Sequence, residues 1–364
     1  MNPKNHKIAF RVDSSAQIGI GHLIRCLTLA NYLLKRKIKS IFICRNHSKN
    51  LISLLLSNNH HVEILPQKKI IYQISQKEPY SDWLGNSWEE DAKETIEIVT
   101  KYELSWLVVD HYAIDFRWEG AILPYIKNIL VIDDLANRKH LCSILLDQNY
   151  KDNMHDKYYD LVFPATKLLL GPQYALIKEE FNLNRSASLK RKKSPSFKKL
   201  LIFMSGSDPN NETLKALIGA IESKNQFESI DLVIGEMYKF KDDILKYQKK
   251  FPHLDIYVQT DQMFKLMAEA DIAIMGGGSV TWEKCTLGLP SLVTILAENQ
   301  ELIANSMHNL GAQITLGWYN NLTSKSYTEA LNQLTKQDML SMTKIASNVT
   351  DGLGLEKIYK SLGL

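Results

Sequence analysis

The fold of the chain is predicted mainly from one stretch, Arg11-Val-Asp-Ser-Ser-Ala-Gln-Ile-Gly-Ile-Gly-His-Leu-Ile-Arg-Cys26. Residues 8–12 are mostly apolar and end in a β-branched Val, which is typical of a strand. Gly19 and Gly21 then follow two residues apart, and from Leu23 onward apolar residues recur at helical spacing. This order predicts the first strand–turn–helix unit of a parallel α/β sheet. Its turn should lie at the carboxyl edge, where such sheets bind ligands.

His22 falls on the first turn of the predicted helix. The positive end of a helix disfavours a charged imidazole, so we expect His22 to be neutral and able to accept a proton. The alternative is a glycine-tightened turn with a solvated His, because Gly-x-Gly-His is a short and unspecific motif.

The composition indicates a two-domain protein in a reducing compartment. A chain of 364 residues is long for one hydrophobic core. It is 45% hydrophobic and 23% charged with a net charge of +4, which is ordinary for a globular protein and too weakly basic to indicate nucleic acid. The scattered cysteines Cys26, Cys44, Cys142 and Cys285 favour free thiols over disulfides. With neither a signal-peptide core nor an apolar run of membrane length, we expect a soluble, cytoplasmic monomer without membrane insertion.

Several apolar runs in the first half of the chain stop abruptly at polar residues. The runs 104–110, 129–132 and 144–146 stop at Asp110-His-Tyr112, Asp133-Asp134 and Asp147-Gln-Asn149. Since parallel strands end at one edge of a sheet, these polar groups are expected to converge on a ligand. Residues 66–90, between two of the predicted elements, are expected to form a loop.

Metal binding is a minor alternative. Asp110 and His111 together with Asp133 and Asp134 could hold a cation, whereas His60-His61 is predicted to be a loop pair. The sequence contains no HExxH motif and no Cys/His cluster, so no metal site is expected.

The opening pattern returns in the second half. Residues 182–199 are basic and serine-rich, and we predict a linker over 184–199 between domains at 1–183 and 200–364; a phosphate-binding patch is the alternative. A strand at 200–203, a small-residue turn and a helix at 212–221 follow. The prediction is an α/β protein with two Rossmann-like domains facing across a cleft. A helical stretch at 337–364 is expected to pack back across their interface.

The most informative stretch of the second half is Gly276-Gly-Gly-Ser-Val-Thr-Trp-Glu-Lys-Cys-Thr-Leu-Gly-Leu-Pro290. Its glycines let backbone approach a ligand, and Ser279 or Thr281 can start a helix whose free N–H groups bind phosphate without a metal. Glu283 is placed to accept hydrogen bonds from a ribose diol; a tight turn with a surface Glu is the alternative. Neither half has a Walker A Lys, and the Gly19/Gly21 pair lacks the third glycine of a dinucleotide fingerprint.

Taken together and in order, these motifs resemble the UDP-2,4-diacetamido-2,4,6-trideoxy-β-L-altropyranose hydrolases of pseudaminic acid biosynthesis. The matching residues are Arg11, Asp13, Ser15, residues 18–22, Arg25-Cys-Leu27, Asp110-His-Tyr112, Ile132-Asp-Asp-Leu-Ala136, Arg138, His140, Leu146-Asp-Gln-Asn149, Leu170-Gly-Pro-Gln-Tyr-Ala-Leu176, Glu180-Phe181, Asp208-Pro-Asn-Asn211, Gly288-Leu-Pro290 and Ala297-Glu-Asn-Gln300. The resemblance is collinear over roughly residues 8–310. Ser205 and Ser143 depart from it, since a glycine and an Asp are usual there. That family is similar in fold to GT-B glycosyltransferases that use UDP-N-acetylglucosamine.

The resemblance implies a hydrolase that releases UDP and the free sugar for pseudaminic (nonulosonic) acid synthesis, and hence for flagellin glycosylation or surface polysaccharide. It implies His22 as the general base for water attacking the anomeric carbon with inversion, and Tyr112 as a second catalytic residue near the sugar. The implied substrate-binding residues are Asp13, Gly19, Gly21, Asn211, Gly277, Ser279, Glu283, Asn299 and Gln300. No cofactor is implied, because UDP is a good leaving group, one base is enough, and helix N-termini can carry the developing charge.

Two alternatives remain at the level of the sequence. One is a GT-B transferase that moves an N-acetylhexosamine from UDP to an acceptor, and the other is a non-catalytic module that binds UDP-sugars. Release of UDP without an acceptor distinguishes the hydrolase from the first, and any turnover distinguishes it from the second.

Overall fold

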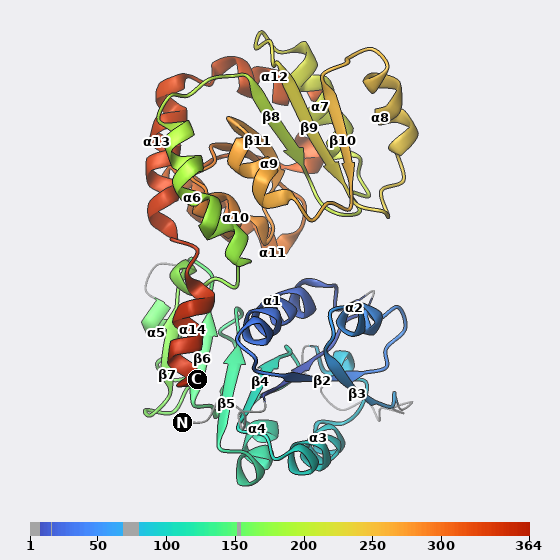
Figure 1. Cartoon of the computed structure of the whole chain (residues 1–364), viewed down its shortest axis with the longest axis vertical. Helices are drawn as coiled ribbons and strands as arrows, with labels where there is room; N and C mark the ends of the chain where they lie inside the picture. The colour runs from blue at the N-terminus through green and yellow to red at the C-terminus, as the bar shows by residue number, and fades with distance from the viewer. Residues whose placement is uncertain (1–7, 16, 68–79, 151–153) are drawn as a thin grey trace. The chain divides into compact units, whose positions relative to one another are not determined.

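The structure, a computed structural model, describes residues 8–15, 17–67, 80–150 and 154–364. The chain divides into two compact units (Figure 1): unit 1 is Met1–Lys178 with Gly354–Leu364, and unit 2 is Glu179–Leu353. Each unit contains one parallel sheet with helices between its strands, as the sequence predicted. Within the described part of the chain, no helix combines the length and the apolar character needed to cross a membrane.

The sheet of unit 1 has seven parallel strands in the order β3-β2-β1-β4-β5-β6-β7. They are β1 (Ile8–Val12), β2 (Ser40–Arg45), β3 (His61–Leu65), β4 (Trp106–Asp110), β5 (Asn128–Ile132), β6 (Ile144–Asp147) and β7 (Lys167–Leu170). The strand order reverses between the neighbours β1 and β4, where Val12 is paired with Asp110. The loops leaving such a pair diverge to opposite faces, and the crevice between them is where α/β sheets bind ligands.

Helices cover both faces of this sheet (Figure 1). They are α1 (Gly21–Lys35), α2 (Ile52–Ser57), α3 (Trp88–Tyr102), α4 (Phe116–Ile122), α5 (Met154–Tyr158) and α14 (Gly354–Leu362), with short 3-10 turns η2 (Ser81–Leu84), η3 (Leu123–Tyr125) and η4 (Pro172–Tyr174). The apolar side chains of α1, α2 and α14 share one core with one face of the sheet, and those of α3 and α4 share a second core with the other face. The helical spacing predicted from Leu23 onward is confirmed.

Unit 2 repeats the plan with six parallel strands in the order β10-β9-β8-β11-β12-β13. The strands are β8 (Lys199–Phe203), β9 (Ser229–Ile234), β10 (Leu254–Val258), β11 (Ile272–Gly276), β12 (Ser291–Ile295) and β13 (Ile314–Trp318). The helices are α6 (Glu179–Lys192), α7 (Glu212–Glu222), α8 (Lys241–Gln248), α9 (Met263–Glu269), α10 (Val280–Thr286), α11 (Glu298–Leu310), α12 (Ser324–Gln333) and α13 (Lys336–Val349), with the turn η5 (Tyr319–Asn321). The order reverses between β8 and β11, so this unit also has a switch point.

The predicted linker over 184–199 is wrong, because most of it is helix α6 of unit 2. Its basic side chains bind carbonyl groups at the carboxyl ends of three other helices. Arg185 donates to Thr286 O of α10 and to Ser347 O of α13, and buried Lys192 donates to Met267 O and Ala268 O of α9. Cations at helix carboxyl ends satisfy orphan carbonyls and oppose the helix dipole. The sequence predicted a solvated basic linker, but in the structure these basic side chains bind the ends of other helices.

The end of the chain also differs from the predicted boundaries. The stretch 337–364 is two helices separated at residues 350–353, and the second, α14, belongs to unit 1. Leu355, Ile358 and Leu362 are buried in the core that α1 shares. In the predicted loop 66–90, residues 68–79 lie outside the described residues, η2 occupies 81–84, and α3 begins at Trp88.

Candidate active site

His22 is paired with a carboxylate at the switch point of unit 1. It is the second residue of α1, and its Nδ1 lies 2.6 Å from Oδ1 of Asp110, the last residue of β4. Because an ionised carboxylate only accepts, this contact assigns a proton to Nδ1, near which Arg25 Nη2 also lies at 3.1 Å; in the tautomer with that proton alone, Nε2 is the acceptor. None of the described residues hydrogen-bonds Nε2. The imidazole is thus held with its basic nitrogen unengaged, as a general base requires.

Arg25 clamps the carboxylate that holds His22. Its Nε and Nη2 each lie 2.6 Å from Asp110, one on each carboxylate oxygen, and Nη1 lies 2.9 Å from Asp134 Oδ2. Burial raises the pKa of Asp110, but the charge of Arg25 and then the contact with His22 outweigh burial and hold that pKa well below its usual range. Asp110 is therefore an ionised acceptor in a fixed orientation. Arg25 follows His22 by three residues, which puts both on one face of α1.

An aromatic cluster surrounds the imidazole. The ring of Tyr112 meets the ring of His22 edge-on, with centroids 4.6 Å apart. Trp83 of η2 stacks on Tyr112 at 5.6 Å, and Tyr80 contacts both of these rings at 4.8 and 5.2 Å. Burial, and then the charge of Asp134, raise the pKa of Tyr112 far above its usual range, so its hydroxyl stays protonated. Tyr112 can donate a hydrogen bond but cannot serve as a base.

Asp13 lies deeper than the predicted substrate-binding role suggests. It is 0% exposed, and it is paired with Arg11 at 2.7 Å while accepting the backbone N–H of Arg45 at 2.6 Å. Nε2 of His47 and of His111 face its other oxygen at 3.5 and 3.3 Å. Burial raises its pKa, but Arg11 and then the two imidazoles lower it well below the usual range. Asp13 thus anchors the loop after β1, and its role in substrate binding stays a prediction.

The cation hypothesis for Asp110, His111, Asp133 and Asp134 has no support in the geometry. The guanidinium of Arg25 is paired with the carboxylates of Asp110 and Asp134, and the guanidinium of Arg138 lies 2.8 Å from the carboxylate of Asp133. Because Nδ1 of His111 accepts the N–H of Ala113, its Nε2 carries the proton and faces Asp13 as a donor. Among the residues that the structure describes, no group of three or more His, Cys, Asp or Glu side chains could hold a metal.

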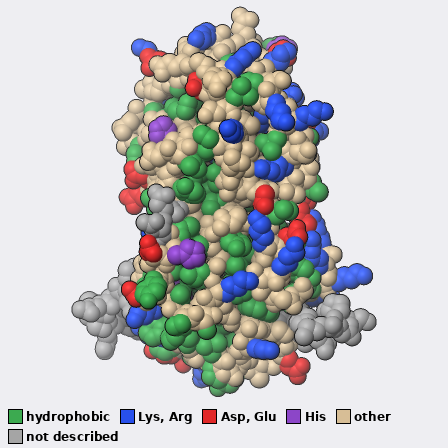
Figure 2. Space-filling view, turned by 90° about the vertical axis from the view of Figure 1, so that its left-hand side faces the viewer, with side chains coloured by type: hydrophobic (Ala, Val, Ile, Leu, Met, Phe, Trp, Pro, Cys, Tyr) green, Lys and Arg blue, Asp and Glu red, His purple; other side chains and the backbone are tan. Residues whose placement is uncertain are grey.

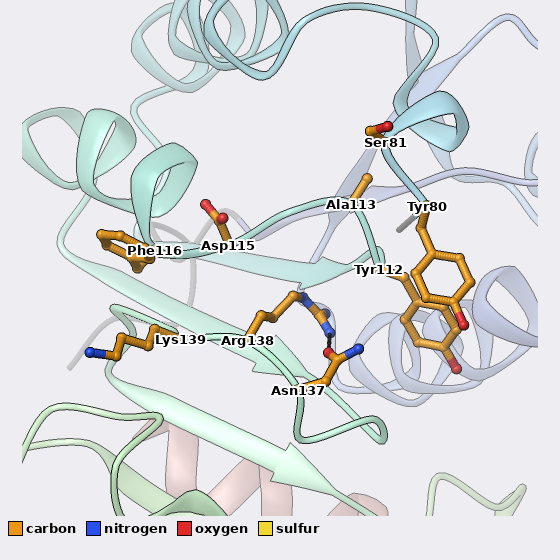
Figure 3. A pocket seen from close by; sticks show the side chains of 9 residues that line it. All are labelled: Tyr80, Ser81, Tyr112, Ala113, Asp115, Phe116, Asn137, Arg138 and Lys139. Atoms are coloured by element: carbon orange, nitrogen blue, oxygen red, sulfur yellow. Dashed lines mark hydrogen bonds between the residues drawn. The ribbon is translucent and has the colours of Figure 1, made fainter. Parts of the chain in front are cut away.

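A pocket of about 280 Å³ opens beside Tyr112 (Figure 3). It is lined by Tyr80, Ser81, Tyr112, Ala113, Asp115, Phe116, Asn137, Arg138 and Lys139. Figure 3 shows the two tyrosine rings next to each other at one end, and Phe116 with Asp115 and Lys139 toward the other. These residues come from the loops after β4 and β5 and from the segment at η2, all within unit 1.

The space beside Gly19 and Gly21, the two predicted glycines of the first turn, is open. Gly19 adopts a φ of +80°, which explains the glycine there, and its N–H donates to Ser15 O. A Cβ added at Gly19 or Gly21 would meet no atom within 4 Å. The packing of the protein therefore does not require a glycine at position 21, and its backbone at the start of α1 is accessible.

In unit 2, the loops after the central strands pack backbone against backbone. A Cβ on Gly276 would lie 2.3 Å from Met204 O, so the turn after β11 fits against the turn after β8 only because it is glycine. Gly277 donates its N–H to Thr294 O and packs against Gln300 and Ala304 of α11. These glycines bring the carboxyl edges of β8, β11 and β12 together.

The other predicted residues of unit 2 lie around this edge. Asn211, at a φ of +55° before α7, accepts a hydrogen bond from the Tyr238 hydroxyl at 2.5 Å. Ser279 is exposed at the start of α10, and Glu283 is half-buried one turn later. Asn299 is exposed on the first turn of α11. The side chain of Gln300 accepts the N–H of Leu296 and so binds the turn that leads into α11.

The two family departures are accommodated locally. Ser205 Oγ accepts the N–H of Asp208, whose carboxylate accepts the N–H groups of Glu212 and Thr213 at the start of α7. Ser143 uses its backbone N–H to pair with Ile129 O at the start of β6.

Sequence reasoning missed Asp110 as the partner of His22, and it missed Arg25, Tyr80 and Trp83 as neighbours. The two signals that could have found the pair are strand ends and helical spacing. Asp110 closes a strand next to the one that leads into His22, and Arg25 lies one helical turn after His22. Tyr80 and Trp83 come from the segment predicted as loop, and no periodicity identifies them.

Comparison with known proteins agrees with the motif resemblance. The chain is 27% identical over 309 residues to the UDP-2,4-diacetamido-2,4,6-trideoxy-β-L-altropyranose hydrolase of Campylobacter jejuni, covering 85% of this chain and 98% of that protein. It is 28% identical over 301 residues to the uncharacterized protein MJ1062 of Methanocaldococcus jannaschii, covering 81% of this chain but 56% of that longer protein. The spore coat polysaccharide biosynthesis protein SpsG of Bacillus subtilis is 26% identical over 53% of this chain and 57% of its own length. No family model matches the chain.

Solved structures confirm the predicted fold. MurG of Acinetobacter baumannii superposes with a TM-score of 0.69 at 13% identity, covering 99% of both chains. UDP-GlcNAc 2-epimerase of Neisseria meningitidis, bound to UDP-GlcNAc, gives a TM-score of 0.58 at 14% identity over 98% of this chain and 99% of the other. The chain therefore has the α/β fold of GT-B glycosyltransferases, and its sequence resembles a hydrolase of UDP-sugars.

Proposed function

We propose that this protein hydrolyses a UDP-linked 2,4-diacetamido-2,4,6-trideoxy sugar at the anomeric C–O bond, releasing UDP and the free sugar. The observation that carries the proposal is the 2.6 Å contact between His22 Nδ1 and Asp110, which orients the ring so that Nε2 can serve as the base. The collinear similarity to the Campylobacter jejuni hydrolase supports the substrate class.

The chemistry requires one base. Water attacks the anomeric carbon as His22 Nε2 takes its proton, and the bond from that carbon to the UDP oxygen breaks. The bonding electrons leave with UDP, so a single displacement inverts the anomeric centre. Asp110 stabilises the imidazolium that forms, and the protonated Tyr112 hydroxyl orients the water or the sugar.

Unit 2 is proposed to hold UDP at its own switch point. The glycine-tightened turns after β8 and β11 supply backbone N–H groups for phosphate, and Glu283 is proposed to accept from the ribose diol. Gly19 and Gly21 in unit 1 are proposed to let substrate approach the start of α1, because the space beside them is open. Neither role calls for a metal or cofactor.

A glycosyltransferase is the second candidate, since the fold is that of MurG. It would use the same base to deprotonate an acceptor hydroxyl in place of water. UDP release measured with and without candidate acceptors decides between them: a hydrolase turns over at full rate in buffer alone.

The decisive variant is His22→Asn, because Asn has a similar size and still hydrogen-bonds but cannot take a proton at Nε2. We expect UDP release to fall about 10²–10⁴-fold, the usual contribution of a general base. UDP affinity, measured by calorimetry on both proteins, should not change. If the variant keeps most of its turnover, or loses UDP binding in step with turnover, His22 is structural and the proposed mechanism is wrong.

A further inference from the structure

His111 lies between two residues of the candidate active site. It follows Asp110, which holds His22, and it precedes Tyr112, whose ring meets the imidazole of His22 edge-on. Successive side chains along a strand point to opposite faces of a sheet, and His111 is the first residue after β4. Asp110 points toward α1, whereas the His111 side chain is buried on the opposite side and is only 1% exposed. The proposed chemistry gives this buried imidazole no role.

Both ring nitrogens of His111 face a polar group of unit 1. Nδ1 accepts the N–H of Ala113 at 3.1 Å, so Nε2 carries the proton of the neutral ring, and Nε2 lies 3.3 Å from Oδ2 of Asp13. Burial lowers the pKa of His111, although the contact with Asp13 opposes this, and the ring is therefore neutral at neutral pH. A neutral imidazole accepts on one side and donates on the other, which is what these two contacts require.

The His111 backbone closes the turn that carries Tyr112. Its carbonyl accepts the N–H of Ile114 at 3.1 Å and a guanidinium N–H of Arg138 at 3.4 Å. Together with the contact at Nδ1, three hydrogen bonds to this one residue fix the turn after β4. The conformation of the turn sets where the Tyr112 ring lies beside the base.

Asp13 is a fixed anchor for the other end of the imidazole. It is the first residue after β1 and is fully buried, and its Oδ1 accepts from Arg11 Nη1 at 2.7 Å and from Arg45 N at 2.6 Å. Its Oδ2 faces the imidazoles of His111 and His47. Because a buried ionised oxygen requires donors, the N–H of His111 is held toward it. The loops after β2, β1 and β4, three neighbouring strands, thus meet at one carboxylate.

We propose that His111 is a positioning residue of the reaction. By linking Asp13 to the turn after β4, its imidazole fixes the residue on either side of it: Asp110, which orients the base, and Tyr112, which packs against the base. The inference rests on the proposed function and assigns His111 to catalysis rather than to binding. Since UDP is proposed to bind in unit 2, loss of the His111 imidazole should lower kcat and leave UDP affinity unchanged.

Three substitutions test the linkage. His111→Asn keeps an acceptor near the position of Nδ1 but ends short of Asp13, whereas His111→Gln extends an amide N–H toward Asp13. His140→Asn is the matched control, because His140 is another fully buried imidazole of unit 1, paired with the carboxylate of Glu119 at 2.7 Å. We expect His111→Asn to lower the kcat of UDP release about ten- to a hundredfold, the effect of slightly misplaced catalytic groups. KM and UDP affinity should not change, His111→Gln should recover most of the rate, and His140→Asn should keep it.

NMR of the full chain with ¹⁵N-labelled histidine provides a readout without substrate. The Nδ1 proton of His22, assigned by its loss in His22→Asn, should resonate at low field because it lies in a 2.6 Å contact with a carboxylate. We expect this resonance to move upfield in His111→Asn, to return toward its wild-type position in His111→Gln, and to be unchanged in His140→Asn. The same spectra give the tautomer of His111 in the wild-type protein, where the proton is expected on Nε2.

The outcomes separate this inference from the proposed function, because the NMR signal needs no turnover. A wild-type kcat and an unmoved His22 resonance in His111→Asn overturn the positioning role, even if the protein hydrolyses a UDP-sugar. A moved resonance in a protein that never releases UDP overturns the hydrolase and keeps the role. A loss of UDP affinity in step with kcat, or an equal loss of kcat in His140→Asn, overturns the role because His111 is then structural. Thermal unfolding shows whether each variant is folded. If His111→Asn is not, the wild-type spectrum still decides, since a proton on Nδ1 of His111 overturns the inference.

Discussion

At the scale of single residues, the site depends on a chain of fixed donors. Arg25 fixes the carboxylate of Asp110, Asp110 fixes the Nδ1 proton of His22, and this leaves Nε2 as the basic atom. Each step is a charge-assisted contact in a buried environment, where it is stronger than in water. The orientation of the His22 imidazole therefore depends on Asp110 and Arg25.

We predict that Asp110→Asn lowers UDP release at least tenfold while KM changes little. An amide that donates to Nδ1 would select the other tautomer and place the proton on Nε2, as loss of the carboxylate does in hydrolase triads. The variant also leaves Arg25 partly uncompensated, which costs about 3–5 kcal/mol of stability. The rate is measured well below its unfolding midpoint. Asp134→Asn removes a carboxylate from the same guanidinium and should retain far more activity. Wild-type turnover in Asp110→Asn would show that the tautomer is set by other groups.

Glu283 is predicted to act on binding rather than on chemistry. Glu283→Ala removes a carboxylate acceptor, and one charge-assisted hydrogen bond is worth about 1.5–3 kcal/mol. We expect UDP affinity to fall about ten- to a hundredfold, read by calorimetry. Glu298→Ala, an exposed carboxylate on the next helix, is the control and should bind UDP normally. Unchanged affinity in Glu283→Ala would make this residue part of the surface of α10 only.

At the scale of elements, the basic side chains of α6 hydrogen-bond the carboxyl ends of other helices. Its Arg185 reaches Ser347 O at 2.6 Å and Thr350 O at 3.2 Å, besides Thr286 O. Lys192 does the same at α9, and burial, and then the charge of Arg191, lower the pKa of Lys192 to about 7. Basic side chains of α6 thus bind carbonyl groups at the carboxyl ends of α9, α10 and α13.

Arg185→Met should destabilise unit 2 by about 2–4 kcal/mol, because several charged hydrogen bonds to otherwise orphaned carbonyls are lost. Urea unfolding followed by native-state hydrogen exchange in α10 and α13 measures the loss. Lys190→Met, on the exposed side of the same helix, should change stability by less than about 0.5 kcal/mol. Equal effects of the two substitutions would mean that α6 is held by its apolar contacts alone.

At the scale of the whole molecule, charge is distributed unequally between inside and outside. On the face shown in Figure 2, Lys and Arg side chains are interspersed with acidic and uncharged ones from one end to the other. Inside unit 1, by contrast, ionised carboxylates are buried beside cations. Asp13, Asp91, Asp110 and Asp133 are all fully buried, or nearly so, and bind Arg11, Arg25, Arg45 or Arg138.

These buried pairs predict that acid unfolds unit 1 first. Burial raises the pKa of each carboxylate, but its arginine partner outweighs burial, so each pKa lies below the ordinary 3.8. Below pH 3.8 the unfolded chain binds more protons than the folded one, and stability falls by up to about 1.4 kcal/mol per pH unit for each group. Above that pH the contribution is complete and flat. Hydrogen exchange at pH 5, 4 and 3 should show β1 and β4 losing protection before β8 and β11. The reverse order would contradict the role assigned to these pairs.

Local order along the chain determined much of this protein. A strand, a glycine turn and a helix recur in both halves, and residues ending strands next to each other had to meet at one edge. Such signals lie within a few neighbouring residues. The helical spacing from Leu23 onward and the glycines from Gly276 onward therefore predicted local structure without knowledge of the rest of the fold. The sequence could also place His22 on the first turn of its helix.

The contacts that these residues make could not be predicted from local order, because they depend on how the strands are arranged in the sheet. The pairing of His22 with Asp110 joins positions 88 apart, and it exists because β1 and β4 are neighbours in the sheet. Asp13 is paired with Arg11 inside the fold, and most of the basic run at 184–199 lies in helix α6, where Arg185 and Lys192 bind carbonyls far along the chain. From the sequence alone, a charged side chain is predicted to be exposed, because its partner is unknown. That partner is fixed by topology rather than by spacing, which is why the fold was predictable and the surroundings of the base were not.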